Sequence, residues 1–260
     1  MVRLMAICAG LVWAAAATGA WAADTALAPA GTLRAVYLDG NPAQAVRDPA
    51  TGEITGVAAD LARELAREAG VPLQLTPARG VQGVIDAVHG DAADIGFLAN
   101  DPSRAGPVVF SQTYLRNPQG VLTREGSALN AVTDIDRPGI RIGVLRGDSI
   151  MLWLTRNRPG VSLVVRDADG PSEAAMLQAG TIDGFAGNRL RLSTIAAATP
   201  GLRILPGSIM GVPQAIIVKA GNTAALAALN TFIDRCRANG FLQAAIARAA
   251  NGTEMEPAPR

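Results

Sequence analysis

The stretch GDAADIGFL, residues 90–98, decides the fold of this chain. An apolar helical pattern over residues 81–88 ends just before Gly90, and the run 94–98 that follows predicts a short buried strand. A helix that leads through a tight turn into an apolar strand is typical of layered α/β structure with parallel strands. The fold can therefore be followed outward from this unit in both directions.

The same alternation of apolar strands and helical periods continues on both sides of that unit. Strands are expected at residues 32–38, 71–75, 110–122, 141–145, 162–165, 183–186 and 212–219, and helices at residues 57–69, 172–179 and 223–239, with two more starting at Ser149 and Phe241. Since the strand–helix rhythm occurs in two halves, the sequence predicts two similar α/β lobes joined by two crossings of the chain.

The first 22 residues, MVRLMAICAGLVWAAAATGAWA, have the pattern of a secretory signal. Arg3 supplies a positive charge, an apolar run follows over residues 4–17, and small residues at Ala20 and Ala22 predict cleavage before Ala23. The apolar run is shorter than the roughly 20 residues that a membrane-spanning helix needs. Export with cleavage is therefore favoured over a membrane anchor.

Composition excludes several functional classes. Arg3 is the only charged residue of the signal, so the chain's net charge of +1 disappears on cleavage, and no nucleic-acid partner is expected of a neutral chain. Cys236 is then the only cysteine, which excludes an internal disulfide, and its place on an apolar helix stripe predicts a buried hydrophobe. With His89 as the only histidine, a zinc site or a catalytic triad has little support.

Four short motifs follow one another in a fixed order along the chain. They are Gly56-Val57-Ala58-Ala59-Asp60-Leu61-Ala62, Gly90-Asp91-Ala92-Ala93-Asp94-Ile95, Pro102-Ser103-Arg104 with Phe110-Ser111 and Tyr114, and Gly180-Thr181-Ile182-Asp183-Gly184. In this order and spacing, from about residue 31 to about residue 248, the sequence resembles the solute-binding proteins of ABC importers, in extracellular solute-binding family 3, the polar amino acid-binding type.

The resemblance implies an α/β fold of the two-lobed periplasmic-binding-protein type (type II), with two mixed sheets flanked by helices and two hinge crossings. Lobe 1 would hold residues 23–114 and 214–260, and lobe 2 residues 115–213. A periplasmic protein is implied that captures a small polar ligand, an amino acid or small carboxylate, in the interlobe cleft by hinge closure. A membrane permease of an ABC importer is the implied partner, and we expect a monomer without cofactor, metal or catalytic residues.

Arg104 is the foremost candidate for ligand binding. In the family, the arginine at this position grips the ligand's carboxylate, and a guanidinium offers a planar fork of donors that suits this task; a plain surface arginine is the alternative. Asp101 orients Arg104, accepts from the ligand or merely caps a turn. Leu98, Ala99 and Asn100 replace a Ser/Thr-rich loop of the family, so contacts there are expected mainly through the backbone.

Gly147, Asp148 and Ser149 lie between a strand and a helix of the second half. Backbone N–H groups at a helix start attract negative charge, so they are expected to meet the same carboxylate from the opposite side. The family usually has Thr or Ser after this glycine. Asp148 departs from that pattern, and it either caps the helix or repels an acidic ligand.

Asn188 occupies the position at which the family has an aspartate that pairs with the ligand's α-ammonium. An amide brings no negative charge and loses roughly 1–2 kcal/mol of charge-assisted hydrogen bonding, so an acid without the amine becomes a candidate beside the ordinary amino acids. Asn41 is also expected at the cleft, in a turn-rich stretch without an aromatic platform, which favours a small ligand over an aromatic or large cationic one.

Two other functions stay open on the sequence alone. An enzyme of the same fold, such as a cyclohexadienyl dehydratase, would need a general acid in the cleft, and Glu173 and Asp148 are the candidates. A binding protein that reports to a receptor, or that serves a redox system, would have the same cleft chemistry as a transport component. Residue patterns therefore do not separate these two binding roles.

Overall fold

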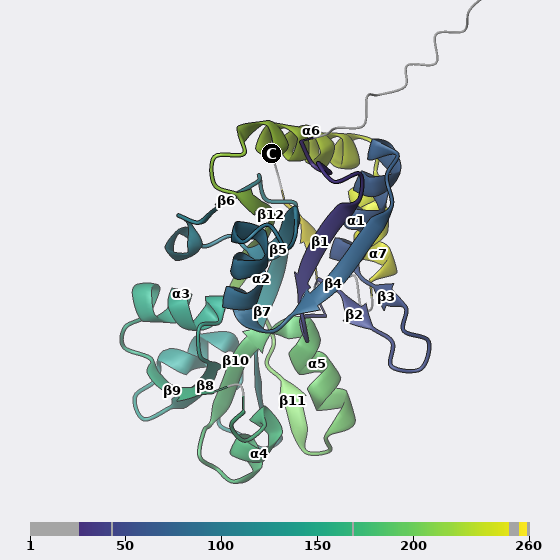
Figure 1. The fold of residues 1–260 in the computed structure, drawn as a ribbon. Coiled ribbons are helices and arrows are strands. Elements are labelled where there is room, and N and C mark those ends of the chain that lie inside the picture. The colour runs from purple at the N-terminus through teal and green to yellow at the C-terminus, as the bar shows by residue number, and fades with distance from the viewer. Residues whose placement is uncertain (1–25, 43, 168, 250–254, 259–260) are drawn as a thin grey trace, which may run out of the picture.

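The computed structural model describes residues 26–42, 44–167, 169–249 and 255–258. The expected signal over residues 1–22 lies outside them. In the view of Figure 1 the chain forms an upper and a lower α/β unit, which meet where strands β7 and β12 lie. Within the described ranges, no helix combines the length and the apolar character needed to cross a membrane.

Strands and helices alternate along most of the chain. The strands are β1 (Leu33–Leu38), β2 (Val46–Arg47), β3 (Ile54–Thr55), β4 (Leu73–Ala78), β5 (Ile95–Ala99), β6 (Val108–Phe110), β7 (Leu115–Arg124), β8 (Arg141–Leu145), β9 (Ser162–Arg166), β10 (Gly184–Asn188), β11 (Leu202–Ile204), β12 (Met210–Lys219) and β13 (Glu256–Pro257). The α-helices are α1 (Val57–Ala69), α2 (Gly80–His89), α3 (Ser149–Asn157), α4 (Glu173–Gln178), α5 (Arg189–Ala198), α6 (Thr223–Ala238) and α7 (Phe241–Arg248).

Helix α1 has the bounds that its apolar spacing predicts, and Gly70 ends it in the left-handed conformation. The extended stretch expected over residues 110–122 is divided between β6 and β7. Helix α5 was not expected, because its apolar residues are spread around the helix instead of forming one stripe. Strand β4 begins two residues later than expected.

The strands join into one eleven-stranded sheet with the order β4-β1-β5-β12-β7-β10-β8-β9, with β6, β11 and β13 pairing beside this path. Strands β4, β1 and β5 are parallel to one another, as are β10, β8 and β9. The two expected sheets are thus fused through β12 and β7, which pair antiparallel and are the two crossings. The lobe boundaries themselves, residues 23–114 with 214–260 and residues 115–213, stay a prediction.

Each unit has an apolar cluster on both faces of its part of the sheet. In the upper unit, α1, α6 and α7 pack on one face around Phe97 and Phe232, and α2 covers the other face through Val84 and Val88. In the lower unit, α3 contributes to one cluster, and α4 and α5 contribute to the other. Cys236 is buried in the first of these clusters, as predicted, and burial raises the pKa of its thiol to about 12.

Gly56 joins the turn-rich loop to the start of α1. Its φ of 125° lies in a region that side-chain-bearing residues rarely adopt, and a Cβ at this position would lie 2.5 Å from the carbonyl oxygen of Gln44. That same carbonyl accepts a hydrogen bond of 2.9 Å from the N–H of Ala58 in the first turn of α1. Gly56 therefore allows the helix start and the Gln44 backbone to pack together.

We expect Gly56→Ala to lower the free energy of unfolding by about 1–3 kcal/mol, since the added methyl forces either backbone strain or loss of the Gln44 contact. Urea unfolding of the purified protein measures this. Gly160→Ala is the control, because its added Cβ meets nothing within 4 Å, and it should change stability by no more than about 0.5 kcal/mol. Equal unfolding midpoints for the two variants would contradict the role of Gly56.

Candidate functional site

A cavity of about 750 Å³ lies between the two units, over the pairing of β7 with β12. This volume falls in the ordinary range of small-molecule sites. Most of the residues expected to bind the ligand line this cavity: Asn41, Leu98, Ala99, Arg104, Gly147, Asp148, Ser149 and Asn188. Asn100 and Asp101 do not line it; the Asn100 N–H donates to the carbonyl of Pro213.

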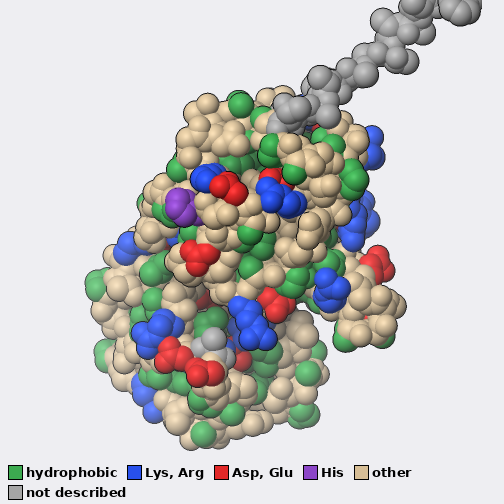
Figure 2. All heavy atoms as spheres, in the orientation of Figure 1, with side chains coloured by type: hydrophobic (Ala, Val, Ile, Leu, Met, Phe, Trp, Pro, Cys, Tyr) green, Lys and Arg blue, Asp and Glu red, His purple; other side chains and the backbone are tan. Residues whose placement is uncertain are grey.

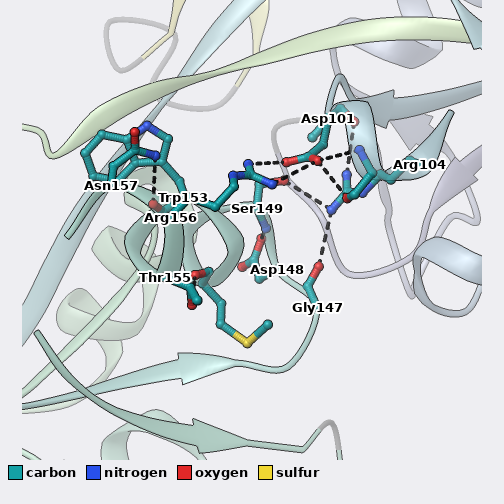
Figure 3. A network of polar contacts seen from close by, with 12 residues as sticks. Asp101, Arg104, Gly147, Asp148, Ser149, Trp153, Thr155, Arg156 and Asn157 are labelled. Carbon is teal, nitrogen blue, oxygen red and sulfur yellow. Dashed lines mark hydrogen bonds and ion pairs between the residues drawn. The ribbon is translucent and has the colours of Figure 1, made fainter. Parts of the chain in front are cut away.

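Arg104 ends the 3-10 helix Pro102–Arg104, and its guanidinium points across the cleft toward the other unit (Figure 3). Nη1 donates to the carbonyl oxygen of Ala99 (3.0 Å), and Nη2 donates to the carbonyl oxygen of Gly147 (3.2 Å) and to Oγ of Ser149 (3.2 Å). The residue is only 8% exposed. Among the described residues, all acceptors of this guanidinium are neutral, and none forms an ion pair with it.

Burial lowers the pKa of Arg104, although the charges of Asp101 and Asp148 oppose the shift. A desolvated cation that has only neutral acceptors is less well compensated than one with a carboxylate partner. Because Arg104 lies on a cavity wall, its positive charge, which lacks a carboxylate partner, is accessible to a ligand. The site can therefore bind an anionic group by charge-assisted hydrogen bonds.

Asp101 caps a turn and pairs across the cleft. Its carboxylate accepts from the N–H (3.0 Å) and the Oγ–H (2.7 Å) of Ser103. Of the three roles expected for Asp101, these bonds correspond to capping a turn. It also accepts from Arg156 of α3, with Oδ2 2.7 Å from Nη2 (Figure 3). Burial raises the pKa of Asp101, but the hydrogen bonds from Arg156 and Ser103 outweigh it and lower the pKa to about 2.

The turn before α3 forms the facing wall. Gly147 has φ 73°, and its carbonyl is the one that Arg104 reaches. Asp148 is the N-cap of α3, because its Oδ1 accepts from the N–H of Ser149 (2.6 Å), so the capping role holds here also. Burial raises the pKa of Asp148, while the Ser149 N–H and the charges of Arg104 and Arg191 oppose the rise.

Asn188 uses both of its side-chain polar atoms within the protein. Its Oδ1 accepts from the N–H of Arg191 (3.2 Å) and so caps α5, and its Nδ2 donates to Oδ1 of Asn41 (3.3 Å). The Asn188–Asn41 contact joins the two units, as do Asp101–Arg156 and the bonds of Arg104. Among the described residues, these three sets of polar contacts bridge the cleft.

Glu173, one candidate for a general acid, is 4% exposed and does not line the cavity. It pairs with Arg166 (3.0 Å) and with Arg191. Burial raises the pKa of Glu173, but its own backbone N–H and the two arginines lower it by more. Glu173 is therefore held in the ionised form, which has no proton to give.

Sequence reasoning missed the floor of the cavity. Four buried side-chain amides line it, from Gln44, Asn117, Gln119 and Gln214. The signal was present in part: polar side chains at Asn117 and Gln119 are two residues apart in an extended stretch, which places them on one face of the strand. Arg191, which lines the lower wall, follows Asn188 on the unexpected helix α5 and was missed with it.

Acidic and basic side chains lie beside one another over the face drawn in Figure 2, which carries no continuous basic stripe. Within the described ranges, no group of three or more His, Cys, Asp or Glu side chains is arranged to hold a metal ion. A second hollow, of about 560 Å³, lies on the upper unit beside Asp91 and Lys219, whose charges pair with each other.

A sequence model of the bacterial extracellular solute-binding proteins, family 3, matches residues 33–250. The L-cystine-binding protein of Escherichia coli is 26% identical over 196 residues, which is 74% of this chain and 73% of that protein.

Solved structures share the fold. The solute receptor for L-cysteine of Neisseria gonorrhoeae has a TM-score of 0.72 at 19% identity, over 91% of this chain and 99% of that one. An amino acid ABC transporter substrate-binding protein from Streptococcus pneumoniae, bound to L-arginine, has a TM-score of 0.68 at 20% identity, over 88% and 97%. These likenesses confirm the two-lobed α/β fold class.

The Asp101–Arg156 pair should stabilise the bridged form of the cleft. We expect Arg156→Gln to weaken this form by on the order of 1 kcal/mol, which increases the population of open molecules several-fold. Small-angle scattering of ligand-free protein should then give a larger radius of gyration than for wild type. The control is Arg158→Gln, because Arg158 pairs with Asp136 inside the lower unit. The same radius for both variants would contradict a bridging role for Arg156.

Asp101 should also give the protein a specific acid sensitivity. Its pKa is about 2 in the folded protein and about 3.9 when unfolded, so its stabilising contribution is complete above about pH 4 and is lost as the pH falls toward 2. Urea unfolding of wild type and Asp101→Asn should therefore show a stability difference at pH 6 that shrinks between pH 4 and pH 2. A difference that stays constant over this range would refute the lowered pKa.

Proposed function

Because this chain belongs to the bacterial extracellular solute-binding proteins, family 3, we propose that its interlobe cavity captures a small polar ligand through a carboxylate group held by Arg104. The protein is a solute-binding protein, and the proposal concerns which residues bind and what they select. Closure of the two units on the ligand is part of the proposal, as is common for two-lobed binding proteins.

The buried guanidinium of Arg104 is the observation that carries this proposal. It lines the cavity, and its acceptors among the described residues are neutral oxygens. The other two arginines of the lining already have carboxylate partners: Arg146 pairs with Asp167, and Arg191 pairs with Glu173. A ligand carboxylate would give Arg104 the charge-assisted partner that the protein does not supply.

The cavity restricts the second polar group of the ligand less than it restricts the carboxylate. Asn188 has both polar atoms engaged, so the position that holds the α-ammonium in the family offers little to an amine here. A ligand that carries an ammonium group would find a carboxylate at Asp148, which lines the same wall and has no ion pair within the described part of the chain. Both amino acids and small carboxylates without an amine therefore fit this site.

The lining favours a small ligand. The apolar residues that line the cavity are aliphatic, such as Leu38, Val81 and Val212, and no aromatic side chain is among the described lining residues. An aromatic or a large cationic ligand would lack a stacking surface.

Export to the periplasm, with cleavage before Ala23, and delivery to the membrane permease of an ABC importer complete the proposal. Support comes from the signal pattern in the first 22 residues, from the family, and from the ABC transporter role that the Streptococcus pneumoniae structure's description gives to that protein. A monomer is proposed as the functional unit. A dehydratase activity has no support from Glu173, because this carboxylate is ion-paired away from the cavity.

Purified, ligand-stripped protein should bind carboxylates in a panel of amino acids, small mono- and dicarboxylates, and amine-free analogues. At about 100 times the dissociation constant, a binder stabilises the protein by about 2.7 kcal/mol, which thermal unfolding detects as a shift of a few degrees.

Arg104→Met should then weaken the best binder by at least roughly 100-fold in calorimetry, because loss of a buried charge partner costs about 2–5 kcal/mol. Arg146→Met is the matched control, since Arg146 lines the same cavity but is exposed and paired with Asp167, and it should change the affinity by no more than about threefold. Unchanged affinity in Arg104→Met, with circular dichroism showing an intact fold, would exclude Arg104 as the carboxylate site.

A further inference from the structure

The floor of the cavity consists of side-chain amides. Gln44, Asn117, Gln119 and Gln214 all line it, and each is between 0% and 3% exposed. None of the four carries a charge. This sets the floor apart from the walls, where the arginines and Asp148 lie.

The β7–β12 pairing holds three of these amides in place. Asn117 lies opposite Val212 in the antiparallel register, and alternate residues of a strand share a face. Gln119, two residues from Asn117, and Gln214, two residues from Val212, are therefore on the same face of the ladder. The cavity lies over this face, so the two strands that join the units also present the amides to a ligand.

Most of the floor is already hydrogen-bonded within the protein. Gln44 accepts through Oε1 from the N–H of Leu38 (3.0 Å) and donates through Nε2 to Oε1 of Gln214 (3.3 Å). Gln119 donates to the backbone carbonyl of Asn117 (3.1 Å). These bonds hold the surrounding amides in defined orientations.

The side chain of Asn117 is different. It forms no hydrogen bond with the described residues, and its Oδ1 is buried without a partner. Leaving a buried polar group unsatisfied costs about 1–3 kcal/mol. Because rotation about the Cβ–Cγ bond exchanges Oδ1 and Nδ2, this side chain can offer either an acceptor or a donor to a group in the cavity.

We propose that this amide floor binds the uncharged polar end of the ligand, with Asn117 as the specificity-determining residue, and that the ligand is a small carboxylic acid with a terminal carboxamide. This inference rests on the proposed capture of the ligand's carboxylate by Arg104. A carboxamide has both a donor and an acceptor, so it complements an unpaired amide in either orientation.

Other ligand ends fit the floor less well. An apolar end would leave Asn117 unsatisfied and buried. A second carboxylate or an ammonium group would lose its hydration against neutral amides without gaining an opposite charge. The floor therefore discriminates by hydrogen bonding, which rejects a ligand that lacks the matching group more strongly than shape does.

Calorimetry with two matched ligand series tests this. The amine-free series is glutaramic acid, glutaric acid and pentanoic acid, which differ only in a carboxamide, a carboxylate or a methyl end. The second series adds the α-amine: glutamine, glutamate and norvaline. In both series, the carboxamide should bind at least roughly tenfold more tightly than the other two members, since about 1.4 kcal/mol is a factor of ten.

Asn117→Leu removes the amide at nearly constant size. It should abolish the carboxamide preference, by weakening glutaramic acid and by strengthening pentanoic acid, whose apolar end then leaves no amide unsatisfied. The matched control is Asn157→Leu at the exposed end of α3, away from the cavity, which should keep the preference. If Asn117→Leu does not fold by circular dichroism, Asn117→Ala supplies the same comparison, because alanine also lacks a hydrogen-bonding side chain.

The outcomes separate this inference from the proposed function. If carboxylates bind and depend on Arg104 but the carboxamide has no advantage, or if the advantage persists in Asn117→Leu, the amide floor is not the specificity site and the proposed function stands. Binding of other carboxylates but of none of these six overturns the carboxamide class. If no carboxylate of any kind binds, Arg104 is not a carboxylate site and both proposals fail.

Discussion

The pairing of β7 with β12 is the constraint on which the rest of the molecule depends. Strand β5 pairs with β12 only from Gln214 onward, and β10 pairs with β7 only from Gln119 onward. Strand β13 pairs with β7 only at Leu115 and Arg116. Around Pro118 and its register partner Gly211, the sheet between the units is thus narrowed to these two strands. Proline has no N–H to donate, and a two-stranded ribbon twists more readily than a wide sheet. The two units can therefore change their relative orientation here while each keeps its own packed layers.

Several of the charges around the cleft are paired within the protein. Asp101 pairs with Arg156, and Arg191 with Glu173, so these charges are compensated within the protein. Arg104 is held instead by neutral oxygens from both units. This arrangement separates the charges that hold the walls together from the charge of Arg104, which is the proposed ligand contact. Because these charged side chains form pairs of opposite sign, a nearly neutral chain can contain a strongly polar site.

The sequence predicted the parts of the site that depend on local signals. The resemblance of their motifs to the family placed Arg104 and Asn188 at the cleft, where both line the cavity, and the position of Asp148 before a helix predicted its capping role. The partner of Asp101 was not predictable in this way, because Arg156 lies 55 residues away and meets it only through the packing of the two units. The amide floor could be predicted only in part, because Gln44, the Asn117–Gln119 segment and Gln214 lie far apart in the sequence and meet only in the folded structure.

The bridging bonds of Arg104 also bear on the kinetics of capture. Gly147 and Ser149 supply acceptors to the same guanidinium nitrogen that would hold a ligand carboxylate. In the bridged state Nη2 already donates to two oxygens, so a ligand carboxylate that uses this nitrogen has to displace them, whereas molecules in which Nη2 is free bind it without this cost. Apparent affinity then equals the intrinsic affinity reduced by the fraction of such molecules. In the ligand-free protein these oxygens keep the buried guanidinium hydrogen-bonded, so a proposed ligand could leave without exposing Arg104 to the full cost of an unpaired buried cation.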